Sequence, residues 1–422
     1  MLPPVAVLLF ALAATTSAAQ AAYKPDMTPR AEERIKNVVV LIMENRSFDS
    51  FLGRLKWDGI NPNVNGLTGD EFNIVDGKKV LVSKVSEPAA GFNPKHSVDH
   101  VTQQIYGTGV VNASGKTPTM AGFGQDGFQF SGNSQNAVTQ VMGAFGPDML
   151  PVTYALAQEF SIIQDWFASV PGPTYPNRHF AHCATAVGLT DNSNLLSGVG
   201  CRTIFENLDD NGKSWNIYGS TAKLSTLLYK SMRWPNKLLH IRSIDRFISD
   251  AKDGKLPQYS YIDPDFDKND NHPPNDIREG ERFVKKLYEA VRASPQWNQT
   301  LFLITYDENG GFFDHVPPPT GVPIPDDSSV SPPVGDFKFD RLGPRVPAIL
   351  ISPLVPKGGV FRSTVPGRNY EHSSIPATLK KLFRLPSFLT QRDAWALPFD
   401  DIASLPSPRT DCPVTLPNPH AP

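Results

Sequence analysis

The chain has 422 residues, of which 40% are hydrophobic and 10% are aromatic. This apolar content is enough for a folded core and argues against an intrinsically disordered chain. The 40 Lys and Arg residues nearly balance the 42 Asp and Glu residues, giving a formal net charge of −2. Without a large positive field to attract phosphate backbones, the chain is not expected to bind nucleic acid.

The first 21 residues have the pattern of a secretory signal peptide. An apolar run over residues 3–14 is too short to cross a bilayer, and small residues with two A-x-A-like sites follow it, ending at Ala19 and Ala21. We therefore expect a secreted protein, with an uncleaved anchor as the alternative. Three cysteines fit an oxidising compartment, and closeness in sequence favours a Cys183–Cys201 disulfide.

Residues 35–43 (IKNVVVLIM) predict a strand that is buried on both faces of a parallel sheet. This strand runs into the motif Glu44-Asn45-Arg46-Ser47-Phe48-Asp49. Ligands of open α/β sheets bind at the carboxyl ends of strands, and hard divalent cations prefer oxygen donors. Glu44 and Asn45 are therefore candidate metal ligands. The alternative is that Asn45 and Asp49 only cap the next helix.

Residues 61–145 are rich in Gly, Asn and Gln and show no long periodic segment. We interpret them as a loop-rich insertion or cap over the edge of the sheet. Two sequons, at Asn112 and Asn298, would be glycosylation sites on a secreted surface. A helix is predicted for residues 151–160.

The next motif is Val170-Pro171-Gly172-Pro173-Thr174-Tyr175-Pro176-Asn177-Arg178. It predicts a helix that begins near Pro176 with Thr174 at its N-cap, where free N–H groups create an anion site. A threonine hydroxyl deprotonated by a metal can attack an electrophile held there. Asn177 and Arg178 are predicted to contact phosphate oxygens. The commoner role of Thr174 would be that of a plain cap.

A second strand, residues 301–306 (LFLITY), ends in Asp307-Glu308-Asn309-Gly310-Gly311-Phe312-Phe313-Asp314-His315. Adjacent carboxylates repel each other unless a cation lies between them, so Asp307 and Glu308 are further metal candidates. An exposed turn is the alternative. Two strands that deliver oxygen ligands to one edge favour a metal site.

The remaining pattern predicts the fold class. Helical patterns over residues 278–293 and 374–383 and a third apolar strand at 346–351 alternate along the chain, while residues 317–333 look like a long surface loop. This alternation predicts an α/β sandwich on a mostly parallel central sheet flanked by helices. We expect one domain over residues 22–400, followed by a Pro-rich tail at 401–422.

Four histidines lie in polar, loop-like stretches beside these motifs, where they could supply a general acid and clamps for phosphate oxygens: His96, His272, His315 and His372. A lone loop histidine is usually just solvated. Motifs of metalloproteases, serine-hydrolase elbows, phosphate-binding loops and dinucleotide-binding folds are absent from the sequence.

Four separated motifs together resemble the phosphoesterase family, which contains non-specific phospholipases C and related acid phosphatases on an alkaline-phosphatase-like α/β core. The resemblance runs from about residue 35 to about residue 383 and rests on the segments at 44–49, 173–178, 305–311 and 370–374. It implies that Thr174 is a nucleophile that becomes transiently phosphorylated. It also implies a divalent cation, or a polar set that activates the nucleophile, at Glu44, Asn45, Asp307 and Glu308.

By the same resemblance, His96, His272 and His372 match phosphate-binding and acid/base histidines, with Asn177 and His315 as further catalytic candidates. Asn275 stands where related members have a second histidine, and an amide cannot act as a general acid. The segment Asn61-Pro62-Asn63-Val64-Asn65-Gly66 is similar to one in plant members of the phospholipase C branch.

The resemblance therefore implies a secreted phospholipase C that releases diacylglycerol and a phosphorylated headgroup and makes transient contact with membrane surfaces. A secreted acid phosphatase acting on small phosphomonoesters is the nearest alternative. An inactive secreted binding protein is a third.

Overall fold

The structure is a computed structural model, and it describes residues 31–89, 91–110, 112–193, 197–220, 224–326 and 337–419. The predicted signal peptide, residues 1–21, lies outside the described residues, and so does part of the predicted loop at 317–333. Within the described ranges, no helix has the length and apolar character needed to span a membrane.

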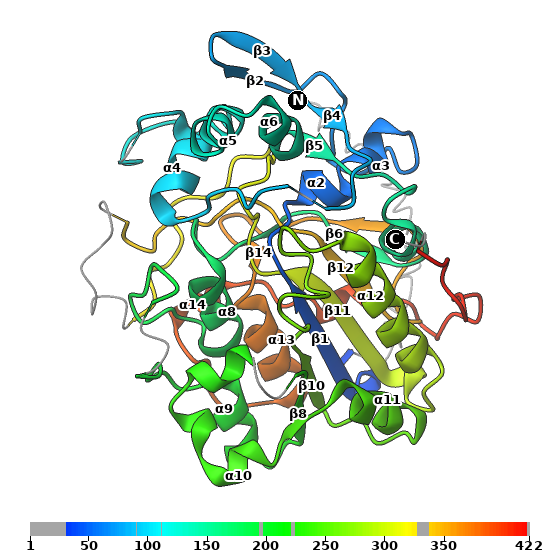
Figure 1. The fold of residues 1–422 in the computed structure, drawn as a ribbon. Coiled ribbons are helices and arrows are strands. Elements are labelled where there is room, and N and C mark those ends of the chain that lie inside the picture. The colour runs from blue at the N-terminus through cyan, green and yellow to red at the C-terminus, as the bar shows by residue number, and fades with distance from the viewer. Residues whose placement is uncertain are drawn as a thin grey trace, which may run out of the picture.

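An eight-stranded sheet forms the centre of the molecule, with the strand order β13-β6-β12-β11-β1-β10-β8-β9 (Figure 1). Its strands are β1 (Asn37–Met43), β6 (Ser161–Ile163), β8 (Trp215–Tyr218), β9 (Ile241–Arg242), β10 (Tyr259–Ile262), β11 (Thr300–Tyr306), β12 (Ala348–Ile351) and β13 (Gly359–Phe361). Strand β12 runs antiparallel to both β11 and β6, and the other pairings of these described strands are parallel. The predicted α/β fold with a mostly parallel sheet is confirmed.

The three apolar runs chosen from the sequence are β1, β11 and β12. Every residue of β1 and β11 is buried, as expected for central strands covered on both faces. Two groups of helices flank the sheet (Figure 1), namely α7 (Pro151–Glu159), α11 (Ile244–Lys252) and α12 (Ile277–Arg292), and α8 (Thr174–Cys183), α9 (Ile204–Asp210) and α13 (Ser374–Phe383). Helices α7, α12 and α13 agree with the predicted ranges to within one residue.

Residues 72–144 fold at the end of the molecule where β1 terminates (Figure 1). They form β2 (Phe72–Val75), β3 (Lys78–Leu81), β4 (Ser83–Lys84), α4 (Val98–Tyr106), α5 (Phe123–Phe130), α6 (Gln135–Val141) and β5 (Gly143–Ala144). Their apolar side chains bury one another in a second hydrophobic cluster that includes Val101, Phe123 and Val138. The helices have seven to nine residues, too short to give a long periodic pattern in the sequence.

The remaining helices and strands are short. They are α1 (Ala31–Arg34), α2 (Phe48–Leu52), α3 (Arg54–Trp57), β7 (Trp166–Phe167), α10 (Pro235–Leu238), β14 (Tyr370–Glu371), α14 (Gln391–Trp395) and four 3₁₀ turns at 225–228, 231–233, 297–299 and 400–402. Strand β14 pairs with β7 in parallel, which brings the chain before α13 back beside the main sheet.

The segment predicted as a tail packs against the body of the protein. Ile402, Cys412 and Leu416 belong to the main hydrophobic cluster, and the Tyr288 hydroxyl donates a hydrogen bond to the Pro413 carbonyl. These three apolar residues bury surface on folding, so prolines nearby do not keep the segment away from the core.

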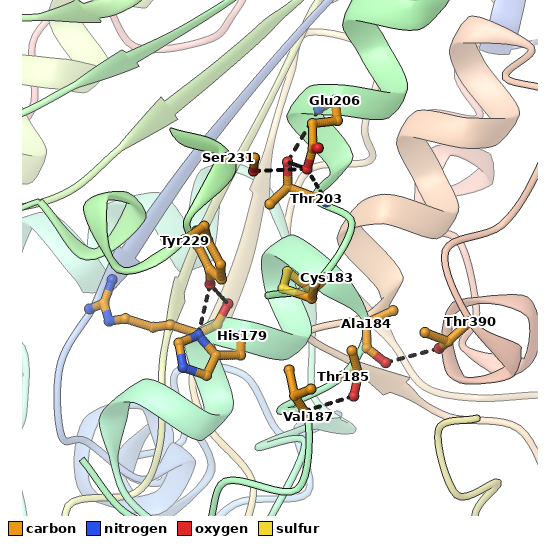
Figure 2. Close-up of a disulfide and its surroundings, with 12 residues drawn as sticks. His179, Cys183, Ala184, Thr185, Val187, Thr203, Glu206, Tyr229, Ser231 and Thr390 are labelled. Carbon is orange, nitrogen blue, oxygen red and sulfur yellow. Dashed lines mark hydrogen bonds between the residues drawn. A yellow bond between two sulfur atoms is a disulfide. The ribbon is translucent and has the colours of Figure 1, made fainter. Parts of the chain in front are cut away.

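The predicted disulfide between Cys183 and Cys201 is present (Figure 2). Among the described residues, Cys412 is a free, buried thiol. The disulfide joins the C-terminal end of α8 to the segment before α9. That segment is itself held by a capping box in which Thr203 and Glu206 bond each other's backbone N–H groups. At the end of α8, the Thr390 hydroxyl donates to the Ala184 carbonyl at 2.9 Å. The C-terminal end of α8 is therefore tied to two other parts of the chain.

Candidate active site

The strands β1 and β11 bring the first two acidic motifs together. They pair in parallel up to Met43 and Tyr306, so Glu44 and Asp307 follow neighbouring positions at one edge of the sheet. The Asn45 N–H then donates to Asp307 Oδ1 at 3.1 Å. The expectation that two strands deliver their ligands to the same edge is confirmed. Gly310, at φ 62°, permits this approach, because a Cβ there would lie 2.5 Å from the Asn45 carbonyl oxygen.

Arg178 occupies the centre of this edge. Its guanidinium binds Glu44 Oε1 at 3.3 Å, Asp263 Oδ1 at 3.1 Å and Asp307 Oδ2 at 3.2 Å, and all four residues are buried. It also donates to the carbonyls of residues 42 and 43 at the end of β1. The prediction that Arg178 contacts phosphate is wrong for this arrangement, because its N–H groups are directed to carboxylates and carbonyls.

The edge holds more buried negative groups than this arginine can neutralise. Burial raises the pKa of Glu44 well above its ordinary value, and the charge of Asp307 raises it further, while Arg178 opposes both effects. Burial and the Asp307 charge likewise raise the pKa of Glu308 well above its ordinary range. An excess of buried carboxylates requires protons or another cation nearby.

Two acceptor atoms fit that second cation. Asn45 Oδ1 and Glu308 Oε1 are buried, and neither has a hydrogen-bond partner in the part of the chain that the structure describes. His96 Nε2 lies 3.7 Å from Glu308 Oε1 and 3.5 Å from Asn45 Nδ2. A buried acceptor without a partner is costly, and a divalent cation would satisfy both oxygens. The four predicted metal ligands therefore divide into two pairs. Glu44 and Asp307 bind Arg178, whereas Asn45 and Glu308 offer the acceptor atoms for a cation.

His96 faces this pair in its neutral form. Its Nδ1–H donates to the Pro94 carbonyl at 2.7 Å, which leaves Nε2 as the acceptor atom that faces Glu308. Burial lowers the pKa of His96 to about 4, so the ring carries no charge near neutral pH. His272 lies beside it, with 6.4 Å between the two ring centroids. The structure thus brings His96, His272, Asn45 and Glu308 together.

Thr174 is the first residue of α8, and Pro173 takes the N-cap position. The helix therefore begins two residues before the predicted start, and Thr174 does not cap it. Thr174 is only 7% exposed as a residue, but its hydroxyl is not among the fully buried polar atoms, and it makes no hydrogen bond to any of the described residues. Thr174 and Arg178 are four residues apart and so lie on one face of α8, about one turn from each other. That face is turned toward Glu44 and Asp307, the carboxylates that Arg178 binds.

Asn177 acts on the backbone before Thr174. Its Oδ1 accepts from the Val170 N–H at 3.0 Å, and its Nδ2 donates to the carbonyls of Gly172 at 2.9 Å and Pro173 at 3.1 Å. Both amide hydrogens are therefore used within the turn. The prediction that Asn177 contacts phosphate is not supported, because the side-chain amide is already hydrogen-bonded to the backbone of the turn before Thr174.

His372 is also fixed by the fold. Its Nε2 bonds the Asp307 carbonyl oxygen at 2.6 Å, and its Nδ1 accepts from the Trp166 indole N–H at 3.2 Å. The residue is fully buried, and burial lowers its pKa to about 4. The predicted acid/base role conflicts with this geometry because both ring nitrogens already have protein partners. His372 instead positions the backbone of Asp307.

The loop at 270–275 carries His272 and the unusual Asn275. Asp270 Oδ1 accepts from the His272 N–H at 2.9 Å and from Asn275 Nδ2 at 2.7 Å. The His272 ring bonds the Pro273 carbonyl through Nδ1 at 2.6 Å, which leaves its Nε2 available. Asn275 therefore holds the loop that places His272 instead of supplying an acid.

His315 belongs to a separate cluster. Its Nδ1 lies 2.7 Å from Asp49 Oδ2, and its Nε2 lies 3.2 Å from Asn65 Oδ1, so neither nitrogen is directed at Glu308. Asp49, Asp314 and His315 are close enough together to hold a metal ion. However, the buried guanidinium of Arg345 already binds both carboxylates, at 3.1 Å and 2.9 Å. The predicted catalytic role of His315 therefore lacks a contact with the site.

Asp263 is the site residue that sequence reasoning missed. It follows β10 just as Asp307 follows β11, and it accepts from Arg178, from Tyr261 at 2.6 Å and from the Ser225 hydroxyl. The signal was present in the sequence, because Asp263 directly follows the strand Tyr259–Ile262. That strand is only four residues long and half aromatic, so its carboxyl end did not stand out.

The model of the phosphoesterase family matches residues 35–386. This chain belongs to the phosphoesterase family. Among curated relatives, non-specific phospholipase C6 of Arabidopsis thaliana is 44% identical over 401 residues, covering 91% of this chain and 75% of the relative. Non-specific phospholipase C1 of the same plant is 45% identical over 403 residues, covering 91% and 74%. This phosphoesterase is therefore a hydrolase that acts on phosphoester bonds.

More distant similarities extend to bacterial proteins. The non-hemolytic phospholipase C of Burkholderia pseudomallei is 28% identical over 81% of this chain and 54% of its own. Among solved structures, the phosphonate monoester hydrolase of Agrobacterium radiobacter shares 11% identity at a TM-score of 0.35, over 83% of this chain and 74% of that one. A Vibrio parahaemolyticus protein in the alkaline phosphatase superfamily has a TM-score of 0.33 and 15% identity, over 57% and 62%. These TM-scores are too low to assign an alkaline-phosphatase-like core.

Proposed function

We propose that this phosphoesterase is a secreted phospholipase C that cleaves the phosphodiester bond of phospholipids through a phosphothreonine at Thr174. The carrying observation is that Thr174 and Arg178 share one face of α8, and Arg178 binds the carboxylates that follow β1 and β11. A hydroxyl that has no hydrogen-bond partner among the described residues thus shares a helix face with the side chain that binds this highly charged, buried edge. The identity with plant non-specific phospholipases C supports phospholipid as the substrate class.

The chain's own residues divide the chemistry between them. The Thr174 hydroxyl oxygen attacks phosphorus, and the bond from phosphorus to the diacylglycerol oxygen breaks. His272 has a ring nitrogen available, so this nitrogen takes the proton of the Thr174 hydroxyl and passes it, as the acid, to that leaving oxygen. Water then attacks the phosphothreonine and releases the phosphorylated headgroup. His372 is excluded from the acid role because both of its nitrogens are bonded within the fold.

A divalent cation would be held by Asn45 and Glu308, with His96 beside them, because these residues offer the acceptor atoms that lack partners. Such a cation would lower the pKa of the attacking hydroxyl and balance charge on the phosphoryl oxygens. Asn177 keeps the turn before Thr174 in place, and the first N–H groups of α8 face the anion.

Secretion is supported by the signal-like pattern of residues 1–21 and by the disulfide, since disulfides persist in oxidising compartments. N-terminal sequencing of protein collected from the medium of expressing cells should find a new N-terminus after Ala19 or Ala21.

The substrate assignment predicts a specific product pair. We expect the purified protein to release diacylglycerol and choline phosphate from phosphatidylcholine, and to hydrolyse p-nitrophenyl phosphate at least about tenfold more slowly in kcat/KM. Chromatography of both products and absorbance of p-nitrophenolate measure the two reactions. Faster turnover of the monoester would identify a phosphatase. Release of free choline would contradict a phospholipase C, and inactivity on both substrates would support a binding protein.

The acceptor pair predicts a requirement for metal. Removal of metal by a chelator should lower activity by about 100-fold or more, and added Mg²⁺, Mn²⁺, Ca²⁺ or Zn²⁺ should restore it. Thermal unfolding gives an independent readout, because a cation at about 100 times its Kd stabilises the folded state by about 2.7 kcal/mol.

Glu308→Gln should fold but lose the rise in unfolding temperature on addition of metal. Glu281→Gln is the matched control because Glu281 is a buried carboxylate that accepts hydrogen bonds from Val152 and Thr153, and it should keep that rise. Full activity after exhaustive chelation would contradict a metal at Asn45 and Glu308.

A further inference from the structure

The hairpin β2–β3 has an apolar face that points outward. Phe72 is 46% exposed, Ile74 50% and Leu81 47%, whereas Asn73 and Val75 between them are buried. Phe72 pairs with Leu81 across the two strands, so their side chains share one face with that of Ile74. Antiparallel surface strands usually direct polar side chains to water and apolar ones inward. Here the outward face is the apolar one.

This orientation is fixed by the contacts of the inner face. The Gly124 N–H of α5 donates to Asn73 Oδ1 at 2.9 Å, and Asn73 Nδ2 donates to the Met120 carbonyl at 3.1 Å. A Cβ on Gly124 would lie only 2.8 Å from Val75 Cγ2, so helix and hairpin are in close contact. Asp76 and Gly77 both have positive φ, the geometry of a two-residue turn that sets the strand register.

The hairpin lies at the same end of the molecule as the active site (Figure 1). Residues 72–144 carry both features, because His96 reaches Asn45 and Glu308 from the loop before α4. The Phe145 N–H, just after this segment, donates to the Ser50 carbonyl of α2, which follows β1. The segment that carries the hairpin therefore also contributes a side chain to the site.

The charge on the outward face suits a phospholipid surface. Lys79 shares that face, and its Nζ lies 4.3 Å from the centre of the Phe72 ring. Lys78 is exposed next to it at the start of β3. Among the described residues of the two strands none is acidic, and Asp76 lies in the turn between them. Apolar side chains flanked by lysine match the boundary between acyl chains and lipid phosphates.

We propose that the face formed by Phe72, Ile74, Lys79 and Leu81 docks this protein onto the phospholipid bilayer that contains its substrate. The choice of a phospholipid bilayer as the partner of this face rests on the proposed phospholipase C function. A bilayer substrate must be reached at its surface, and this apolar face belongs to the same segment as His96 of the active site. Contiguous exposed apolar side chains of this kind mark interaction surfaces.

The test compares a docking variant with a matched control. Phe72→Thr/Ile74→Thr/Leu81→Thr keeps residues that favour strands but removes most of the apolar surface. Leu238→Thr/Leu239→Thr removes side chains that are 44% and 67% exposed near α10, at the opposite end of the molecule (Figure 1). Binding is measured by flotation with dioleoylphosphatidylcholine vesicles. Turnover is measured on the same vesicles and on dihexanoylphosphatidylcholine below its critical micelle concentration.

The triple variant should bind vesicles about 10- to 100-fold more weakly than the wild type and lose a similar factor of turnover on them. Its turnover of the monomeric lipid should be unchanged, and the control should match the wild type throughout. Ile74→Glu, a single change on the outward face, should weaken vesicle binding even if the triple variant fails to fold.

If the triple variant and Ile74→Glu both bind vesicles as tightly as the wild type, the docking surface is overturned. It is also overturned if the wild type is an oligomer that dissociates in the triple variant, since self-association would then explain the exposed apolar face. If the wild type hydrolyses neither lipid, the proposed function fails, while flotation still decides whether this face binds lipid.

Discussion

Thr174→Ala should lower kcat by about 10⁴-fold or more while leaving the protein folded. The Thr174 hydroxyl lies on the same face of α8 as Arg178 and supplies the proposed attacking oxygen, whereas Arg178 is bonded to carboxylates. Since the structure shows no hydrogen bond from this hydroxyl to a described residue, its removal should change the free energy of unfolding by less than about 1 kcal/mol. Steady-state turnover and urea unfolding measure the two effects.

Two further measurements make the assignment specific. Thr174→Ser keeps an attacking oxygen at the same position and should recover much of the lost turnover. Acid quenching of the wild type during turnover should trap a phosphoryl group on the peptide that contains Thr174, detected by mass spectrometry. Activity of the alanine variant above about one-tenth of wild type, or a phosphoryl group on another residue, would refute the nucleophile assignment.

Arg178→Met should destabilise the protein by about 3–5 kcal/mol, because it leaves three buried carboxylates without their cation. Those carboxylates belong to Glu44, Asp263 and Asp307, which lie 3.1–3.3 Å from the guanidinium in the native structure. Arg202→Met is the matched control, since its pair with Asp210 is exposed on both sides. An exposed pair contributes at most about 1 kcal/mol. Urea unfolding measures both variants.

The loss should also depend on pH in a definite direction. Burial raises the pKa of Glu44, Asp263 and Asp307, and Arg178 lowers it, so removing the arginine raises these values further. A group with a raised folded-state pKa favours folding below its unfolded value, about 4, and this contribution is lost as pH rises through the folded value. The deficit of Arg178→Met should therefore be smaller at acidic pH than at neutral pH. A deficit independent of pH would show that the lost arginine acts by packing alone.

The sequence predicted those parts of the site that follow from strand ends. The runs that became β1 and β11 were recognisable because central parallel strands are apolar on both faces, and neighbouring strands end at the same edge. This placed Glu44 and Asp307 side by side in advance. The Cys183–Cys201 pairing was also predicted correctly, from closeness in sequence.

The roles of individual polar side chains did not follow from the sequence. Three side chains suited to binding phosphate have other partners in the structure. Arg178 binds carboxylates, Asn177 bonds the backbone of the turn before Thr174, and His372 bonds the Asp307 carbonyl. A motif shows which functional group lies near the site. The hydrogen-bond partner of that group depends on which other buried polar groups the fold places next to it, because buried polar groups are almost always hydrogen-bonded. Asp263 was missed because its strand is short, and its partner Arg178 lies 85 residues away along the chain.

By itself, the sequence determined the α/β class and the sheet edge at which chemistry is expected. Hydrophobic periodicity and the ends of strands are local properties of the chain, so they can be predicted without knowing which distant residues pack against them. Only the tertiary structure decided that Arg178 binds three carboxylates of the acidic edge, that Asn45 and Glu308 keep acceptor atoms without partners among the described residues, and that one hairpin turns its apolar face outward. These outcomes depend on the competition among buried groups brought together from separate parts of the chain, in which each carboxylate, amide and imidazole takes the partner that offsets its loss of water.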